Sequence, residues 1–136
     1  MLRERILRTL RQALRERGDG LVAAYLFGSV ARGQERADSD VDIGVVLGCR
    51  GGPTIEDLDR LTDLQQHLST LLQREVDVVP LDAASPDLRH QALQDHLLLL
   101  DGDHDARVEF EILARNEYDD HEPFLRAYGQ AVLDRT

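Results

Sequence analysis

The sequence predicts an α/β domain in which helices flank a small β-sheet. Segments with apolar residues at helical spacing alternate along the chain with short apolar segments of strand length. Glycine or proline separates several of these segments, as at Gly18 and Pro80. The 136 residues are enough for one hydrophobic core but hardly for two. We therefore expect a single domain over residues 1–136.

Helices are expected where apolar residues recur every three or four positions and where residues that favour helix ends flank them. Gly18 closes the first helix, and Thr54 is a candidate N-cap for a helix whose leucines we expect in the core. Ser85, followed by Pro86 and Asp87, is a typical helix start. The expected helical segments cover residues 2–17, 29–33, 54–72, 85–95 and 104–133.

Four short apolar segments have the length of β-strands. Pro80 ends the third segment, and an Asp-Gly-Asp turn follows the fourth. Together with the helices, these strands alternate along the chain, which indicates one layered α/β structure. The expected strands cover residues 21–27, 41–47, 75–79 and 97–100.

The composition argues against several classes of protein. The formal net charge is −10, from 26 acidic and 16 basic residues, and the chain has no tryptophan. Such a surface repels nucleic acid unless its arginines cluster, so we expect no direct nucleic-acid binding. No apolar stretch is long enough to span a bilayer, and the first residues lack the pattern of a secretory signal. Cys49 is the only cysteine, which excludes an internal disulfide framework and fits a cytoplasmic location.

A Gly-Ser turn followed by two aspartates is the most informative motif of the chain. The predicted strand 21–27 leads into Gly28, which permits close approach to a ligand, and Ser29 opens a helical stretch whose N–H groups suit a phosphate. Asp40 and Asp42 are two residues apart on an extended segment, so both side chains project to one face. Hard oxygen ligands of this kind select magnesium or manganese. A phosphate-binding turn beside a metal-binding pair indicates attack on a nucleoside triphosphate.

A third carboxylate lies in the middle of the predicted strand 75–79. Asp77 faces the side opposite its apolar neighbours Val76 and Val78. A charged residue inside a valine-rich strand is costly unless it is paired or metal-bound, and a two-metal phosphoryl-transfer site needs more than two acids. Asp77 is therefore the candidate third ligand. The alternative is an edge-strand aspartate that faces water.

These residues resemble the nucleotidyltransferase superfamily that includes DNA polymerase beta and the kanamycin nucleotidyltransferases. The shared signature is a Gly-Ser turn, an Asp-x-Asp pair about ten residues later and a third acid on a later strand. More narrowly, the segments 28–33 and 39–42 resemble the minimal nucleotidyltransferases, or MNT proteins, and the region from 107 to 125 is similar to the way such proteins end. The resemblance implies the polymerase-beta-like fold, in which helices flank a small mixed β-sheet and a C-terminal helix follows.

Many MNT proteins are the antitoxin half of a HEPN–MNT toxin–antitoxin pair. The resemblance therefore implies a magnesium-dependent transfer of AMP from ATP to a tyrosine of a HEPN RNase toxin, which silences the toxin. Two magnesium ions are expected between Asp40 and Asp42, with Asp77 binding the ion that activates the acceptor hydroxyl. The expected catalytic and metal-binding residues are Asp40, Asp42 and Asp77, and the expected nucleotide-binding residues are Gly28, Ser29 and Arg32.

Two other functions stay open at this point. In the first, the protein transfers the nucleotide to a small molecule, such as an aminoglycoside. A chain of this size, however, leaves little beyond the minimal domain to build a substrate pocket. In the other, the protein neutralises the toxin by binding alone and covers its active site. The three acids would then be dispensable for neutralisation.

Overall fold

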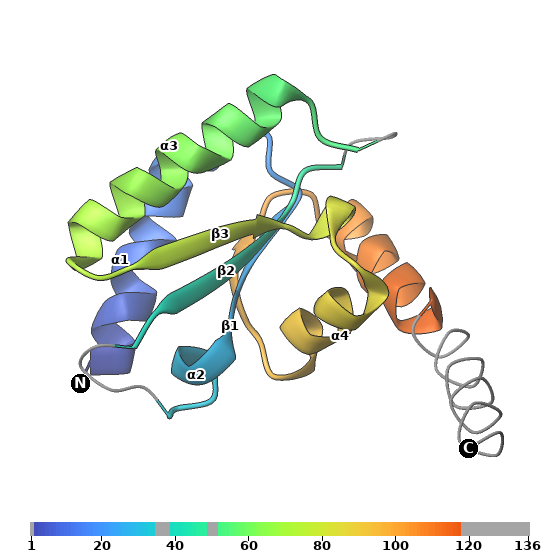
Figure 1. Cartoon of the computed structure of the whole chain (residues 1–136). Coiled ribbons are helices and arrows are strands. Elements are labelled where there is room, and N and C mark those ends of the chain that lie inside the picture. The colour runs from blue at the N-terminus through green and yellow to red at the C-terminus, as the bar shows by residue number, and fades with distance from the viewer. Residues whose placement is uncertain (1, 35–38, 49–51, 118–136) are drawn as a thin grey trace, which may run out of the picture.

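A four-stranded mixed β-sheet forms the centre of the computed structural model, which describes residues 2–34, 39–48 and 52–117 (Figure 1). The strands lie in the order β3-β2-β1-β4. Strand β1 pairs antiparallel with β2 and β4, whereas β2 pairs parallel with β3. The expectation of a small mixed sheet is confirmed. The strands are β1 (Ala23–Phe27), β2 (Val41–Val46), β3 (Val76–Pro80) and β4 (Leu97–Asp101).

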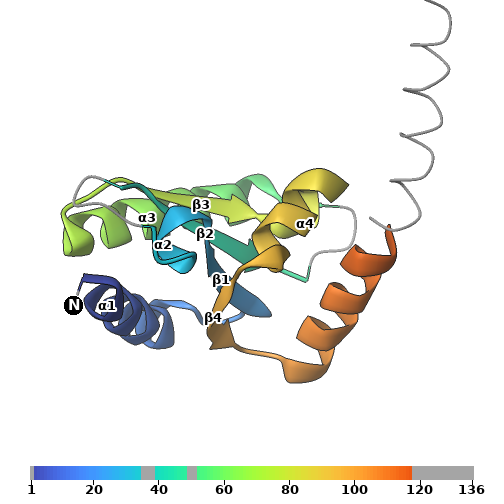
Figure 2. The same cartoon turned by 90° about the horizontal axis from the view of Figure 1, so that it is seen from below.

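Helices cover both faces of this sheet (Figure 2). Helices α1 (Leu2–Arg17) and α3 (Ile55–Leu72) lie on one face, and α4 (Pro86–Gln94) and a helix over residues 104–117 lie on the other. The rest of the expected last helix, from residue 118 onward, lies outside the described residues, as does Cys49. Two short helices, α2 (Gly28–Ala31) and the 3₁₀ helix η1 (Leu81–Ala83), follow β1 and β3.

The two faces of the sheet carry separate hydrophobic clusters. Ala24 and Leu26 of β1 pack with residues of α1 and α3, whereas Tyr25 and Phe27 pack with residues of η1 and α4. Because β1 lies inside the sheet and both of its faces are covered, all five of its residues are buried. This double burial fixes the position at which β1 ends and the Gly-Ser turn begins.

The predicted helix starts are confirmed by their hydrogen bonds. The Thr54 hydroxyl accepts from the backbone N–H of Asp57, and the Asp57 carboxylate accepts from the backbone N–H of Thr54. This reciprocal pair satisfies two donors that a helix start otherwise leaves unpaired. The Ser85 hydroxyl caps α4 in the same way by accepting from the N–H of Leu88.

The expectation that the whole leucine stripe of α3 is core is wrong at two positions. Leu61, Leu64 and Leu68 are buried, but Leu58 and Leu71 are 45% and 47% exposed. The five leucines extend over a wider arc of the helix than α1 and the sheet cover. Helical spacing therefore gives the buried direction of α3 but not the width of its contact.

The strand boundaries differ slightly from those expected. Strand β1 begins at Ala23 because the N–H of Leu21 donates to the carbonyl of Gly18, which closes a turn after α1. Pro80 is the last residue of β3, which it can be because β3 is an edge strand of this sheet. Within the part of the chain that is described, no helix has both the length and the apolar character needed to cross a membrane.

Candidate active site

Two of the predicted carboxylates lie side by side on neighbouring strands. Asp42 of β2 and Asp77 of β3 are partners in the parallel pairing of these strands, so their side chains leave the sheet on the same face. Asp42 is also the antiparallel partner of Phe27, the residue before Gly28. Asp40 stands one residue before β2. The structure thus brings the three acids to the edge of the sheet where β1 ends and β2 and β3 begin.

Contacts from the α3–β3 connection hold the segment that carries Asp40. The guanidinium of Arg74 donates to the carbonyl of Ser39 at 3.2 Å, and the N–H of Val41 donates to the carbonyl of Glu75 at 3.0 Å. The residues on each side of Asp40 are therefore tied to the start of β3. Sequence reasoning missed Arg74, because no motif links a turn arginine to a backbone carbonyl 35 residues away.

Gly28 is required by both its backbone and its neighbour. Its φ of +79° lies in the left-handed region that glycine adopts freely. A Cβ atom at this position would overlap a carboxylate oxygen of Asp42 and lie 3.3 Å from its Cγ. The absence of a side chain at residue 28 therefore allows the Asp42 carboxylate to lie directly against the Gly-Ser turn.

The other two acids raise the affinity of Asp42 for a proton. Burial raises the pKa of Asp42 above its ordinary value, and the negative charges of Asp77 and Asp40 raise it further. Arg32 is the opposing influence, because its positive charge lowers the pKa of Asp42. The ionised form of Asp42 is thus disfavoured by its neighbours, and a cation bound among the three carboxylates would reverse this.

The chemistry of these donors fits a hard divalent cation. Carboxylate oxygens are the ligands that magnesium and manganese prefer, and the repulsion at Asp42 indicates excess negative charge at close range. Over residues 2–34, 39–48 and 52–117, no three His, Cys, Asp or Glu side chains are grouped closely enough to form a complete ion site. Magnesium commonly keeps several water ligands and takes only one or two carboxylates, so a more open arrangement is compatible with it.

A cleft of about 500 Å³ is lined by all three predicted nucleotide-binding residues and by Asp40 and Asp42, whereas Asp77 is not among its lining residues. Ser29 stands at the start of α2, where Phe27 is extended and provides no side-chain cap. Arg32 follows at the end of α2 and is exposed. Sequence reasoning missed Gln91 of α4, which lines the cleft although it lies far along the chain. The lining residues are Phe27, Gly28, Ser29, Arg32, Ser39, Asp40, Asp42 and Gln91.

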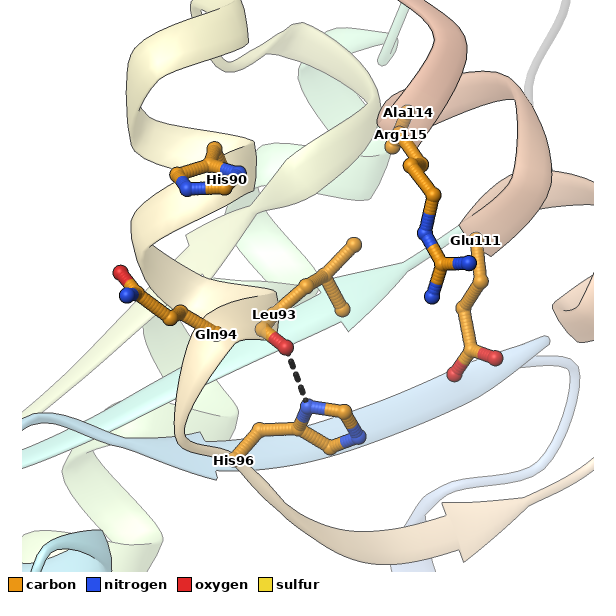
Figure 3. A pocket seen from close by; sticks show the side chains of 7 residues that line it. All are labelled: His90, Leu93, Gln94, His96, Glu111, Ala114 and Arg115. Atoms are coloured by element: carbon orange, nitrogen blue, oxygen red, sulfur yellow. Dashed lines mark hydrogen bonds between the residues drawn. The ribbon is translucent and has the colours of Figure 1, made fainter. Parts of the chain in front are cut away.

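A separate pocket of about 280 Å³ lies between α4 and the helix over residues 104–117 and contains none of the predicted site residues (Figure 3). Its polar groups largely bind other parts of the fold. The Glu111 carboxylate accepts from the buried Tyr25 hydroxyl at 2.9 Å and from Arg107 at 3.0 Å, and Nδ1 of His96 lies 2.8 Å from the carbonyl of Leu93. The hydrogen bond from Tyr25 to Glu111 attaches the helix over residues 104–117 to β1, and an ion pair of 2.6 Å between Arg89 and Glu117 attaches it to α4.

A mixed sheet that joins a Gly-Ser turn to three converging carboxylates is the arrangement of a nucleotidyltransferase, an enzyme class that uses a nucleotide and metal ions. The comparison with known families agrees. The chain belongs to the family described as Polymerase beta, Nucleotidyltransferase, which matches residues 8–105.

Individual relatives narrow this assignment. The chain is 31% identical to the protein adenylyltransferase MntA of Shewanella oneidensis over 121 residues, which are 89% of this chain and 80% of that protein. It is similar in structure to a chain in a crystal structure of a toxin–antitoxin with AMP-PNP, with a TM-score of 0.68, 26% identity and coverage of 94% and 95%. A complex of tri-AMPylated Shewanella oneidensis HEPN toxin with MNT antitoxin also contains a similar chain, with a TM-score of 0.67, 26% identity and coverage of 97% and 96%.

Proposed function

We propose that this protein is an antitoxin that transfers AMP from ATP to a tyrosine hydroxyl of a cognate HEPN RNase toxin and thereby neutralises it. The observation that carries the proposal is the convergence of Asp40, Asp42 and Asp77 beside the Gly28-Ser29 turn. The transferred group and the acceptor are supported by relatives. One is a protein adenylyltransferase, and a similar MNT antitoxin forms a complex with a tri-AMPylated HEPN toxin.

The Gly-Ser turn is proposed to bind the triphosphate. The hydroxyl and backbone N–H of Ser29 donate to the terminal phosphates, and Gly28 lets them approach the backbone. Arg32 lines the same cleft and offsets part of the phosphate charge through its guanidinium. A similar chain crystallised with AMP-PNP supports ATP as the nucleotide.

The three carboxylates are proposed to carry the transfer step. Two magnesium ions held by Asp40, Asp42 and Asp77 would neutralise the triphosphate and lower the pKa of the acceptor hydroxyl. The acceptor oxygen forms a bond to the α-phosphorus, the bond from that phosphorus to pyrophosphate breaks, and a carboxylate oxygen of Asp77 accepts the hydroxyl proton. The protein's contribution is to position these groups and balance their charge, with no covalent intermediate.

The proposed unit is a single minimal nucleotidyltransferase domain over residues 1–136 that acts in the cytoplasm. The sheet, its two helical layers and the cleft all lie within the described residues. In the cytoplasm, ATP, magnesium and a newly synthesised toxin are present together.

Asp42→Asn separates this function from the two alternatives. The variant keeps the shape of the side chain but removes its charge, so we expect it to bind the toxin and fail to modify it. The assay mixes each protein with purified toxin, ATP and magnesium and follows the intact mass of the toxin. Wild-type protein is expected to add AMP-sized steps to the toxin, and Asp105→Asn, at an exposed acid of the helix over residues 104–117 outside the cleft, is the matched control.

Neutralisation of the toxin RNase by Asp42→Asn at the wild-type level would favour an antitoxin that acts by binding alone. A toxin whose mass stays unchanged with wild-type protein, while a small-molecule acceptor is adenylylated, would favour the small-molecule alternative. Either result would contradict the proposed transfer to the toxin.

A further inference from the structure

The helical layer formed by α1 and α3 carries charges of opposite sign on its two outer surfaces. Helix α1 has six arginines and two glutamates in 16 residues, although the whole chain has 16 basic and 26 acidic residues. Helix α3 has four acids and one arginine. The protein is therefore strongly acidic overall but has one basic helix next to an acidic one.

Three charges on each helix lie on the side opposite its buried residues. On α1, Arg8, Arg11 and Arg15 are exposed and follow each other at three- and four-residue spacing, which forms one stripe. On α3, Glu56, Asp59 and Asp63 are exposed at the same spacing. Within the described ranges, none of these six residues takes part in an ion pair. The guanidinium of Arg11 donates to the backbone carbonyl of Leu98 at 3.2 Å, but none of the six charges is paired with an opposite charge among the residues that the structure describes.

The two helices run in opposite directions, and this determines which charges of the two stripes lie at the same end of the layer. The guanidinium of Arg60 in α3 donates to the backbone carbonyls of Arg17 and Asp19, so the C-terminal end of α1 lies beside the N-terminal end of α3. Arg15 and the acids Asp59 and Asp63 therefore stand at the same end of the layer. A groove between the helices is lined by Arg8, Thr9, Gln12, Ala13, Glu16, His67 and Leu71. Of its two hydrophobic residues, Ala13 is buried and Leu71 is half-exposed.

We infer that this layer is a self-complementary surface on which a second copy of the chain docks. A two-fold axis that runs along the groove places α1 of one copy over α3 of the other. The C-terminal end of α1 then lies over the N-terminal end of the partner's α3. Arg15 then faces the partner's Asp59, and the same contact is repeated on the other side of the axis. The two Leu71 side chains meet across the axis near the other end of the layer, because Leu71 lies at the C-terminal end of α3. The cleft stays open, because none of its lining residues belongs to α1 or α3.

The size of the surface indicates a weak dimer. A helix of 16 residues is about 24 Å long, and two neighbouring helices present a face of roughly 500 Å² per copy. The total of roughly 1,000 Å² is at the lower limit for specific interfaces, so we expect a dissociation constant in the micromolar range. The net charge of −10 on each copy also opposes association, and this limits the affinity further.

Exchanging charges between the stripes tests the inference better than changing the salt concentration does. Salt screens both the attraction between the stripes and the repulsion between the whole molecules, so its net effect on association is ambiguous. Sedimentation equilibrium of the full-length chain is expected to give a wild-type monomer–dimer equilibrium. Arg15→Glu and Asp59→Arg should each weaken self-association by about tenfold or more. An equimolar mixture of the two variants should form a heterodimer within about threefold of wild-type affinity, since both contacts are again between opposite charges.

Arg115→Glu is the matched control, because it makes the same charge change at an exposed residue of the helix over residues 104–117. It should leave self-association unchanged, and thermal unfolding should verify that all variants fold. A wild-type chain that stays monomeric up to roughly 200 µM would overturn the inference, as would single variants without effect or a mixture without recovery. Loss of toxin binding in Arg15→Glu, with a monomeric wild type, would assign the layer to the toxin instead.

Discussion

Replacing Gly28 with alanine tests how closely the phosphate-binding turn and the Asp42 carboxylate depend on each other. Alanine at a φ of +79° costs about 1–2 kcal/mol of backbone strain. For a chain of this size, that strain lowers the melting temperature by roughly 3–10 °C. The added methyl group would also occupy the space of a carboxylate oxygen of Asp42, which must move away. A displacement of about 1 Å at a reacting centre reduces the rate by about 100-fold.

Gly20→Ala is the control that separates the two effects. Gly20 has a φ of +85°, but a Cβ atom there would meet nothing closer than a side-chain nitrogen of Arg60 at 3.5 Å. Both variants should therefore lose similar stability, measured by thermal unfolding. Only Gly28→Ala should lose AMP transfer to the toxin, measured by intact mass at a temperature where both are folded. Equal transfer rates for the two variants would refute the idea that residue 28 sets the position of Asp42.

Three further predictions concern stability. Asp42→Asn should raise the melting temperature at pH 7 without divalent cations, because the raised pKa of Asp42 means that its ionised form opposes folding. This gain in stability should vanish below the ordinary carboxyl pKa of 3.8, where the wild-type side chain is protonated in both the folded and the unfolded state. Tyr25→Phe removes the 2.9 Å hydrogen bond to Glu111 and should cost about 1–2 kcal/mol in urea unfolding without changing AMP transfer. Leu68→Ala should cost about 2–5 kcal/mol, whereas Leu71→Ala at its half-exposed site should cost less than about 1 kcal/mol. Equal costs for the two leucines would contradict the assigned core.

Local patterns were sufficient to predict most elements of the fold. The Thr54 cap depends on residues within one helical turn, and the Ser85-Pro86 start does so as well, so both are visible in the sequence. The exposure of Leu58 and Leu71 could not be predicted from neighbouring residues in the sequence. It depends on how far the neighbouring helix and the sheet extend over α3, which is a property of the tertiary structure.

The candidate site was predictable to the extent that its residues lie on adjacent strands. The spacing of Asp40 and Asp42 gave their common face, and the position of Asp77 within a valine-rich strand suggested a partner. The in-register pairing of Asp77 with Asp42 is a property of the assembled sheet. Gln91 and Arg74 were missed because each reaches the site through the arrangement of helices around the sheet.

Counting bound manganese ions by electron paramagnetic resonance, with a non-hydrolysable ATP analogue present, tests most directly whether the three carboxylates hold divalent cations beside a nucleotide. Wild-type protein is expected to bind about two ions per chain, and Asp77→Asn about one, because Asp77 is proposed to hold only the ion nearest the acceptor. The same number of ions in both proteins, at the same affinity, would contradict the role of Asp77 and with it the two-ion site.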